Sequence, residues 1–216
     1  MPELPEIARL AGQMDRHLAG LTVARVETIQ PKSLNLPPED FERALCGATI
    51  RRADYRGKWI RVETTQGWLL INLGMGGELL LLDPERLPEK RRVVFYFTNG
   101  SCLSVNFWWF GYVHYAPVDA LDQHEMLARL GPNVLEVSLE EFRERIAAAR
   151  GKLKAFLLDQ SNLAGIGNAY IHDILFFAGL HPQRRLESLQ AEDFEALARG
   201  IHDGLAPSLQ KGGAFY

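Results

Sequence analysis

Residues 2–6, PELPE, place groups close together that could do chemistry. If Met1 is removed, Pro2 becomes the amino terminus and carries a secondary amine. The ordinary pKa of an α-amino group is about 8, so part of such an amine is unprotonated and nucleophilic near neutral pH. Glu3 and Glu6 are three residues apart and would share one helix face. An amine beside two carboxylates can attack a carbon electrophile and move protons. The alternative is an ordinary helix N-terminus, where proline and glutamate are both common.

A second stretch with chemical potential is DQSNLAGIGN, residues 159–168, between two apolar helical segments. Gly165 and Gly167 allow close approach of the backbone, and Asn168 stands at an expected helix start. Outward-pointing backbone N–H groups at such a terminus suit a phosphate. Lys152 and Lys154 on the preceding helix would add positive charge. A plain helix–turn–helix corner, with glycine needed only for packing, explains the same residues.

The rest of the chain must supply the elements that hold these stretches. Apolar residues at helical spacing predict a helix over residues 3–18, with Gly20 as its stop. From residue 21 to residue 116, short runs of strand-like residues predict a β-sandwich or barrel. Asn99–Gly100 is a candidate type I′ turn. The expected strands are 21–29, 49–55, 59–65, 68–73, 78–82, 92–97, 102–107 and 112–116.

After Pro117 the pattern becomes helical. Ser138 is the expected N-cap of one helix, with Glu140 and Glu141 in its first turn. The fold class is therefore α+β, with an N-terminal helix and β-sandwich in residues 1–118 and a helical domain in residues 119–216. The expected helices of that domain are 122–130, 139–149, 152–159, 168–178 and 191–205.

Composition excludes several classes of protein. The chain is 47% hydrophobic and 24% charged, which is ordinary for a soluble globular protein, and no segment reads as a membrane span or signal peptide. Cys46 and Cys102 are isolated, which fits a reducing, cytoplasmic compartment and argues against a zinc site. The net charge of −3 does not by itself indicate nucleic-acid binding. A basic cluster at residues 51–61 is commonly just a solvated strand face.

Four motifs in one order resemble the formamidopyrimidine-DNA glycosylase / endonuclease VIII family of base-excision repair enzymes. They are PELPE at 2–6, RGK at 56–58, LGMGG at 73–77 and LLDQSNLAGIGN at 157–168. The resemblance spans nearly the whole chain. It implies an N-terminal helix and β-sandwich followed by a helical domain with a helix–two-turns–helix element.

By this resemblance, Pro2 is the nucleophile that attacks C1′ of a damaged nucleotide and forms an iminium (Schiff base) intermediate. Glu3 is the general acid/base at the sugar, Glu6 a supporting carboxylate, and Lys58 holds phosphate and assists departure of the base. The strand is then cut by β,δ-elimination. Without the motif, the sequence would indicate only that Lys58 is a solvated lysine at the start of a strand.

The resemblance also implies DNA contacts. Met75 and Phe110 resemble wedges that fill the space left by an extruded base, although methionine is also a common core residue. Lys154 and Asn168 resemble phosphate contacts of the family, and Asn72, Gly165 and Gly167 are further candidate DNA-binding residues.

Three departures from the family pattern limit these expectations. Asn72 stands where relatives commonly have histidine, and it can still donate to phosphate. Trp109 stands where relatives have an arginine that contacts the base opposite the lesion; tryptophan can stack but cannot form a bidentate fork. The chain stops at Gly212-Gly213-Ala214-Phe215-Tyr216 without the four-cysteine zinc finger of many relatives, so no cofactor is expected and DNA binding should be weak and salt-sensitive.

The sequence thus predicts a bifunctional DNA glycosylase/AP lyase, a monomer whose partner is double-stranded DNA carrying oxidised bases or abasic sites. If Met1 is retained, the Pro2 nitrogen is a tertiary amide and lyase chemistry is impossible. A catalytically silent damaged-DNA or abasic-site binding protein is therefore the first alternative. A general nucleic-acid-binding module that uses only the helix–two-turns–helix element is the second.

Overall fold

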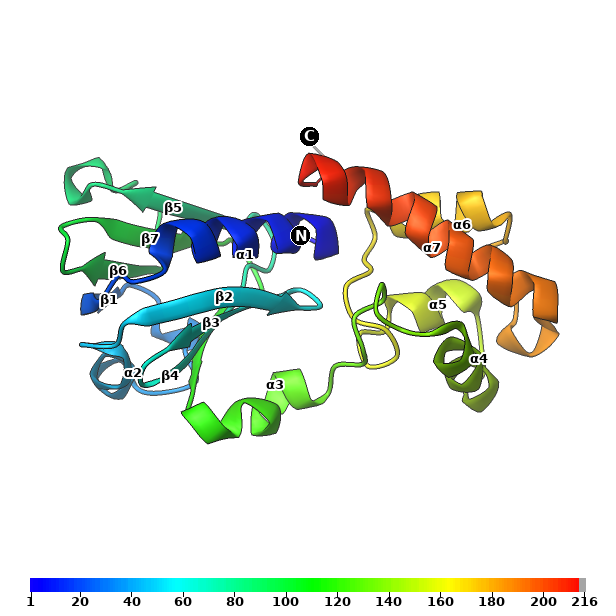
Figure 1. The fold of residues 1–216 in the computed structure, drawn as a ribbon, viewed down its shortest axis with the longest axis horizontal. Helices are drawn as coiled ribbons and strands as arrows, with labels where there is room; N and C mark the ends of the chain where they lie inside the picture. Colours follow the sequence, from blue (N-terminus) through cyan, green and yellow to red (C-terminus); the bar gives the residue numbers. More distant parts are fainter. Residues whose placement is uncertain (214–216) are drawn as a thin grey trace. The chain divides into compact units, whose positions relative to one another are not determined.

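The computed structural model describes residues 1–213, which form two compact units (Figure 1). The first unit is Met1–Pro2 together with Ile7–Leu127. Glu3–Glu6 and the described residues from Ala128 onward form the second unit. The first turn of the N-terminal helix therefore groups with the helical unit, while the rest of that helix groups with the β-rich unit.

Helix α1, Leu4–Leu18, confirms the N-terminal helix expected from the sequence. Its apolar residues recur every three or four positions, so they fall on one face. From Ile7 to Leu18 that face is buried in the core of the first unit.

The first unit is a β-sandwich of two four-stranded antiparallel sheets. One sheet has the order β1-β6-β7-β5 and the other the order β2-β3-β4-β8. Alternating side chains of both sheets meet in one apolar core with α1. The strands are β1 Val23–Thr28, β2 Ile50–Arg56, β3 Trp59–Thr64, β4 Gly67–Asn72, β5 Glu78–Leu82, β6 Val93–Phe97, β7 Cys102–Asn106 and β8 Tyr112–Ala116.

Two local features of this unit differ from the sequence expectation. Helix α2, Pro38–Leu45, forms where no element was expected, and it buries Phe41 and Leu45. The prediction of a type I′ turn at Asn99–Gly100 is wrong, because such a turn needs positive φ at both residues and only Gly100 of the two has it, at 91°. Phe97 N instead donates to Ser101 O, so the loop has three residues and Gly100 takes the left-handed position. Short helical segments complete the unit: η1 Pro31–Ser33, η2 Pro84–Arg86, η3 Val118–Gln123 and α3 Glu125–Ala128, whose last residue begins the second unit.

The second unit is helical, and α6 and α7 lie side by side in it (Figure 1). A Cβ on Gly200 of α7 would come within 2.6 Å of Ile174 O, and one on Gly204 within 2.8 Å of the Ile174 side chain. These glycines therefore permit the close packing of the two helices. The elements are α4 Leu139–Ala148, α5 Leu153–Leu158, α6 Ile171–Ala178, η4 Leu186–Ser188 and α7 Ala191–Lys211.

The expected cap of α4 is confirmed, since Ser138 Oγ accepts a hydrogen bond from Glu141 N at 3.1 Å. Two turns connect α5 to α6, which gives the helix–two-turns–helix arrangement implied by the resemblance. Within residues 1–213, no helix has the length and apolar character needed to cross a membrane.

Candidate functional site

The Glu3 carboxylate is buried inside the second unit, where backbone N–H groups surround it. Gly167 N and Tyr170 N donate to Oε2 at 2.7 and 3.4 Å, and Ala169 N donates to Oε1 at 2.8 Å. The side chain is only 4% exposed. Both oxygens are thus bonded to N–H groups that immediately precede α6, where partial positive charge favours a carboxylate.

The N–H groups of Gly165 and Gly167 were expected to point outward, and that expectation is wrong. Gly165 N donates to Gln160 Oε1 at 3.0 Å, and Gly167 N donates to Glu3. The chain's own side chains therefore accept the hydrogen bonds that a phosphate was expected to accept. Their binding of DNA through other atoms stays a prediction.

Position 165 requires glycine, both because of its backbone conformation and because it lies against Leu4. Its φ is +119°, and an added Cβ would lie 2.5 Å from Leu4 Cδ1. Leu4 N also donates to Gly165 O at 3.1 Å. Glycine at this position therefore lets the N-terminal segment lie directly against the loop.

Gln160 fixes the shape of the loop that precedes α6. Its Nε2 donates to Leu158 O at 2.9 Å and to Ile166 O at 2.8 Å, while its Oε1 accepts from Gly165 N. One side chain thus satisfies three buried or half-buried backbone groups across the loop. The neighbouring Asp159 caps the turn through Ser161, and these hydrogen bonds hold the pKa of the Asp159 carboxyl below its usual value.

Glu6 caps the N-terminus of α1 and also contacts Tyr170. Glu3 N donates to Glu6 Oε2 at 2.9 Å, which is the backbone half of a capping box. The Tyr170 hydroxyl donates to Glu6 Oε1. The structure therefore brings Glu3 and Glu6 together with the loop before α6, and the helix-N-terminus interpretation of PELPE is correct for Glu6. Pro2, one residue earlier, is half-buried and groups with the first unit.

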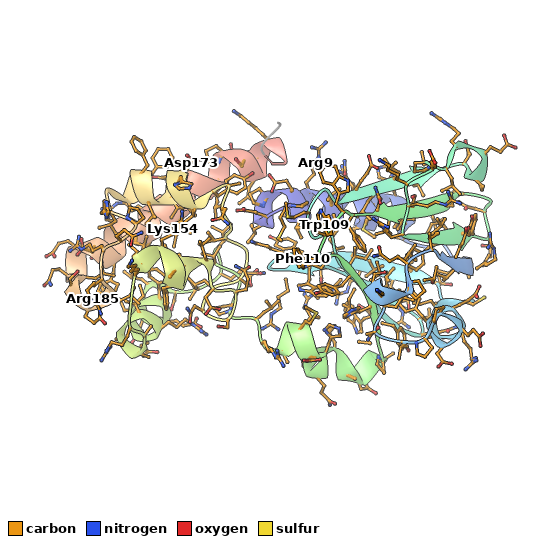
Figure 2. The ribbon with its side chains drawn as sticks, turned by 180° about the vertical axis from the view of Figure 1, so that it is seen from behind. Arg9, Trp109, Phe110, Lys154, Asp173 and Arg185 are labelled. Carbon is orange, nitrogen blue, oxygen red and sulfur yellow. The ribbon has the colours of Figure 1, made fainter. Side chains whose placement is uncertain are left out.

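Lys154 and Asn168, the remaining predicted residues of the second unit, lie at its surface. Asn168 is exposed in the second of the two turns. Lys154, on α5, places its Nζ 3.4 Å from Nε2 of His172 on α6. Lys154 is labelled in Figure 2, as are Asp173 and Arg185 of the same unit. His172 was missed because only the packing of α5 and α6 brings it to Lys154.

In the first unit, the Asn72 side chain connects the turn of Lys58 to the loop after β4. Its Nδ2 donates to Lys58 O at 3.3 Å, and its Oδ1 accepts from Gly74 N at 3.0 Å. Lys58 follows Gly57, whose φ is +57°, in the turn between β2 and β3. Asn72 therefore positions both segments, whether or not it also meets a phosphate.

Met75 and Trp109 lie on adjacent loops that form an antiparallel bridge. Met75 N donates to Trp109 O at 2.8 Å, and Trp108 N donates to Met75 O at 2.8 Å. Met75 is 44% exposed, so the alternative that it is an ordinary buried core methionine is wrong. Trp109 and Phe110, labelled in Figure 2, are 65% and 71% exposed.

The basic cluster of residues 51–61 is largely paired with acids on its own sheet. Arg52 Nε bonds Glu63 Oε2 at 2.6 Å, and Arg61 Nε bonds Asp54 Oδ1 at 2.6 Å. The Arg52–Glu63 hydrogen bond raises the pKa of the arginine and lowers that of the carboxyl. These pairs are consistent with a solvated strand face.

A buried pair of imidazoles in the first unit was not singled out from the sequence. His114 Nδ1 and His124 Nε2 are 2.9 Å apart, and both rings contact Trp59. Burial, with a smaller contribution from His124, lowers the pKa of His114 to about 4. Among residues 1–213, no group of His, Cys, Asp and Glu is arranged to hold a metal ion. The expectation that no zinc finger follows was based on residues 212–216, and residues 214–216 lie outside the described residues.

Comparison with known proteins gives two domain matches that cover most of the chain. The formamidopyrimidine-DNA glycosylase N-terminal domain matches residues 1–107, and the formamidopyrimidine-DNA glycosylase H2TH domain matches residues 130–215. The formamidopyrimidine-DNA glycosylase of Pelobacter propionicus is 36% identical over 220 residues, covering 100% of this chain and 82% of the relative. The Escherichia coli enzyme of the same name is 32% identical, covering 99% and 80%.

Solved structures give the same result. A Lactococcus lactis formamidopyrimidine-DNA glycosylase, non-covalently bound to DNA containing an AP site, has a TM-score of 0.90 and 25% identity, covering 98% of this chain and 83% of the other. A complex of the LlFpg protein with a THF-DNA and an inhibitor has a TM-score of 0.92 and 25% identity, covering 99% and 81%. Sequence, domain and structural matches agree over nearly the full length, and the chain therefore belongs to the formamidopyrimidine-DNA glycosylase family of base-excision repair enzymes.

Proposed function

We propose that this chain, once Met1 is removed, is a bifunctional DNA glycosylase/AP lyase that acts on double-stranded DNA carrying oxidised bases or abasic sites. Family membership supports the glycosylase activity, and the DNA-bound relatives support the substrate class. The observation that carries the proposal is the set of three backbone hydrogen bonds to the Glu3 carboxylate, from Gly167, Ala169 and Tyr170, here named the Glu3 clamp. Because Pro2 is bonded to Glu3, the three N–H groups that fix the Glu3 carboxylate also restrict the backbone that carries the proposed nucleophile.

The proposed chemistry begins when the Pro2 nitrogen donates its lone pair to C1′ of the damaged nucleotide. The glycosidic bond breaks, and its electron pair leaves with the base, which takes up a proton. The nitrogen loses its proton, and the C1′–O4′ bond breaks with its electron pair going to O4′, which takes up a proton. The nitrogen lone pair forms the second bond to C1′, which gives an iminium between Pro2 and C1′. The iminium makes the C2′ proton acidic, so its removal expels the 3′ phosphate; a second elimination expels the 5′ phosphate, and water releases Pro2.

Glu3 is the proposed general acid/base at the sugar. Its Oε1 receives one N–H, from Ala169, and a carboxylate oxygen has two acceptor positions. One position on Oε1 can therefore meet a substrate proton while the remaining N–H contacts keep the carboxylate in place. Glu6 would support it by holding the Glu3 backbone N–H.

Basic, amide and apolar side chains would bind the DNA around the lesion. The proposed phosphate contacts are Lys58 and Asn72 in the first unit and Lys154 and Asn168 in the second, where the Gly165–Gly167 loop directly precedes Asn168. Met75 and Phe110 would fill the space left when the damaged base leaves the stack, at a cost of a few kcal/mol for unstacking. Their exposure of 44% and 71% leaves them accessible for this contact.

Borohydride reduction tests the proposal, because it converts an iminium into a stable amine. Met1-free protein mixed with a lesion-containing duplex and borohydride should give a covalent protein–DNA adduct, and Pro2→Gly should lose most of it. If Met1-free protein binds the duplex but never forms an adduct, the chain is a damaged-DNA binding protein and the proposed chemistry is refuted. If it binds lesion and undamaged duplex equally, lesion recognition is refuted as well.

A further inference from the structure

The two four-stranded sheets of the first unit leave four strands at their edges: β1, β2, β5 and β8. An edge strand presents backbone N–H and C=O groups that no neighbouring strand pairs. On three of the four edges, a side chain from another element bonds such groups. Glu42 Oε1 accepts from a backbone N–H of β1 at 3.1 Å, and Asp15 Oδ1 accepts from one of β2 at 2.8 Å. Asn35 bonds both the N–H and the C=O of Tyr115 in β8, each at 2.8 Å.

Strand β5, Glu78–Leu82, is the fourth edge, and its outward backbone groups have no partner among residues 1–213. The hydrogen bonds of the central strand β7 identify these groups. Phe97 N donates to Ser101 O, and bonded pairs recur at every second residue of an antiparallel pair, so the odd-numbered residues of β7 face β6. The even-numbered residues of β7 therefore bond the even-numbered residues of β5. This register leaves the N–H and C=O groups of Leu79 and Leu81 on the free edge.

An apolar hollow of about 140 Å³ lies beside this edge, between β5 and helix α1. Its apolar walls are formed by Leu10, Met14, Leu18, Leu79, Leu81 and Leu103. A cavity of about 150 Å³ with such walls takes up benzene, so the hollow has room for one large apolar side chain. The two residues with free backbone groups thus also supply an apolar wall, which is the combination that binds an added strand.

The charge beside the hollow is basic. Arg16 and His17 are exposed in the last turn of α1, and His17 lines the hollow. The acid of the same turn, Asp15, is bonded to β2. Among residues 1–213, no carboxylate lines the hollow. A partner segment that carries acidic residues next to apolar ones is therefore complementary to this surface.

We propose that the free edge of β5 binds an extended segment of a partner protein, a short apolar stretch flanked by acidic residues, by adding it to the sheet as a further strand. The added strand bonds the backbone of Leu79 and Leu81, and one of its apolar side chains enters the hollow. Its carboxylates meet Arg16 and His17. None of the residues proposed for catalysis or DNA contact takes part, so this surface goes beyond the proposed function.

Amide hydrogen exchange, read residue by residue by NMR, tests both the register and the binding. In the protein alone, the amides of Leu79 and Leu81 should exchange faster than those of Leu80 and Leu82, which are bonded to β7. The probe is the synthetic peptide acetyl-Asp-Asp-Val-Leu-Val-Asp-Asp-amide. At about ten times its dissociation constant, only the small unbound fraction exchanges freely, so Leu79 and Leu81 should exchange about tenfold more slowly. Absence of binding, or binding without this slowing, overturns the proposal.

Altered peptides separate strand addition from general stickiness. N-methylation of the Val-Leu-Val centre removes the backbone donors and keeps the side chains, and lysine in place of each aspartate reverses the charge. Each change should weaken binding by about tenfold or more, since the first removes several hydrogen bonds and the second places like charges together. Equal affinity for all three peptides overturns the proposal.

Protein variants locate the surface. Leu81→Asp places a charge at the hollow and should abolish peptide binding, while borohydride trapping is unchanged. Leu135→Asp is the matched control, because Leu135 is 38% exposed against 41% for Leu81, and it should leave peptide binding unchanged. Arg16→Glu, a surface change, should weaken the acidic peptide and strengthen the lysine peptide. If the control and Leu81→Asp behave alike, or Arg16→Glu changes neither affinity, the proposal fails.

Two further measurements identify other occupants of the edge. Sedimentation over a range of protein concentrations shows whether the protein self-associates, and a dimer that Leu81→Asp disrupts would assign the edge to a second copy of this chain. Competition by undamaged duplex DNA that displaces the peptide would assign the surface to nucleic acid. Either result overturns the proposal, whereas a monomer that keeps the peptide in the presence of duplex supports it.

Discussion

Replacing Glu3 by glutamine tests the clamp on the N-terminal segment. The substitution keeps the shape of the side chain but turns one acceptor oxygen into an NH2 group. Oε2 accepts two N–H groups and Oε1 accepts one, so the rotamer that loses least places the NH2 at Oε1, facing Ala169 N. Two donors then face each other across 2.8 Å at a site that is 4% exposed.

The cost follows from the hydrogen bonds that are lost or weakened. A buried N–H left without an acceptor costs about 1–3 kcal/mol. The two remaining bonds change from charge-assisted to neutral, which costs roughly another 1 kcal/mol. Glu3→Gln should therefore lower the free energy of unfolding by about 2–4 kcal/mol, a large share of the stability of an ordinary domain.

Urea unfolding followed by circular dichroism measures this loss. Glu144→Gln on α4 is the matched control, because Glu144 is exposed and a surface change of this kind costs at most about 0.5 kcal/mol. A loss for Glu3→Gln no greater than that of the control would refute the clamp. Trapping by the same variant, measured well below its unfolding midpoint, then reports the proposed proton-transfer role separately.

Three further changes give equally specific expectations. Gly165→Ala should destabilise the protein by about 2 kcal/mol or more, because its φ is +119° and the new Cβ meets Leu4, whereas Gly12→Ala in α1 has open space and should stabilise it by up to about 1 kcal/mol. Thermal unfolding compares the two. The lowered pKa of His114, about 4 against 6.5, means that the unfolded chain takes up its proton at higher pH than the folded chain. The contribution of neutral His114 to the free energy of unfolding should thus be fully present above pH 6.5, and about 3 kcal/mol of it should be lost as the pH falls towards 4. Urea titrations at several pH values should show a smaller fall for His114→Phe. Phe110→Gly relieves the positive φ and should raise stability by about 1 kcal/mol while weakening binding to an abasic-site duplex; unchanged binding would contradict the role of Phe110.

The regular elements could be predicted because each depends on a local pattern. Helix α1 and the eight strands lie within about two residues of their expected positions, since apolar periodicity and turn residues are present in the sequence itself. Helix α2 was missed because it is short and buries only Phe41 and Leu45, too few to show a period. The domain boundary at 118/119 stays a prediction; the compact units change at Leu127–Ala128.

The sequence could indicate which residues belong to the candidate site but not how they contact one another. Motifs indicated Glu3, Gly165 and Gly167, yet the hydrogen bond from Gly167 N to Glu3 joins positions 164 residues apart. No local pattern reports such a contact. Tertiary packing also decides that Gln160 fixes the loop, although its position inside the motif was a usable signal.

Charge patterns were the least informative part of the sequence. The basic residues from Arg51 to Arg61 were expected to be no more than a solvated strand face, and strand pairing agrees, because it puts Arg52 opposite Glu63 and Asp54 opposite Arg61. Cross-strand register decides which charges remain available, and register depends on the whole sheet.

Peptide mapping of the borohydride-trapped adduct tests the nucleophile most directly. Met1-free protein is trapped on a lesion duplex, digested with nuclease and protease, and examined by mass spectrometry. The remnant of the sugar should be attached to the N-terminal peptide at Pro2, and Pro2→Gly should lose most of the adduct while still binding the duplex. An adduct located on Lys58 or Lys154, or no adduct from protein shown to begin at Pro2, would contradict the account.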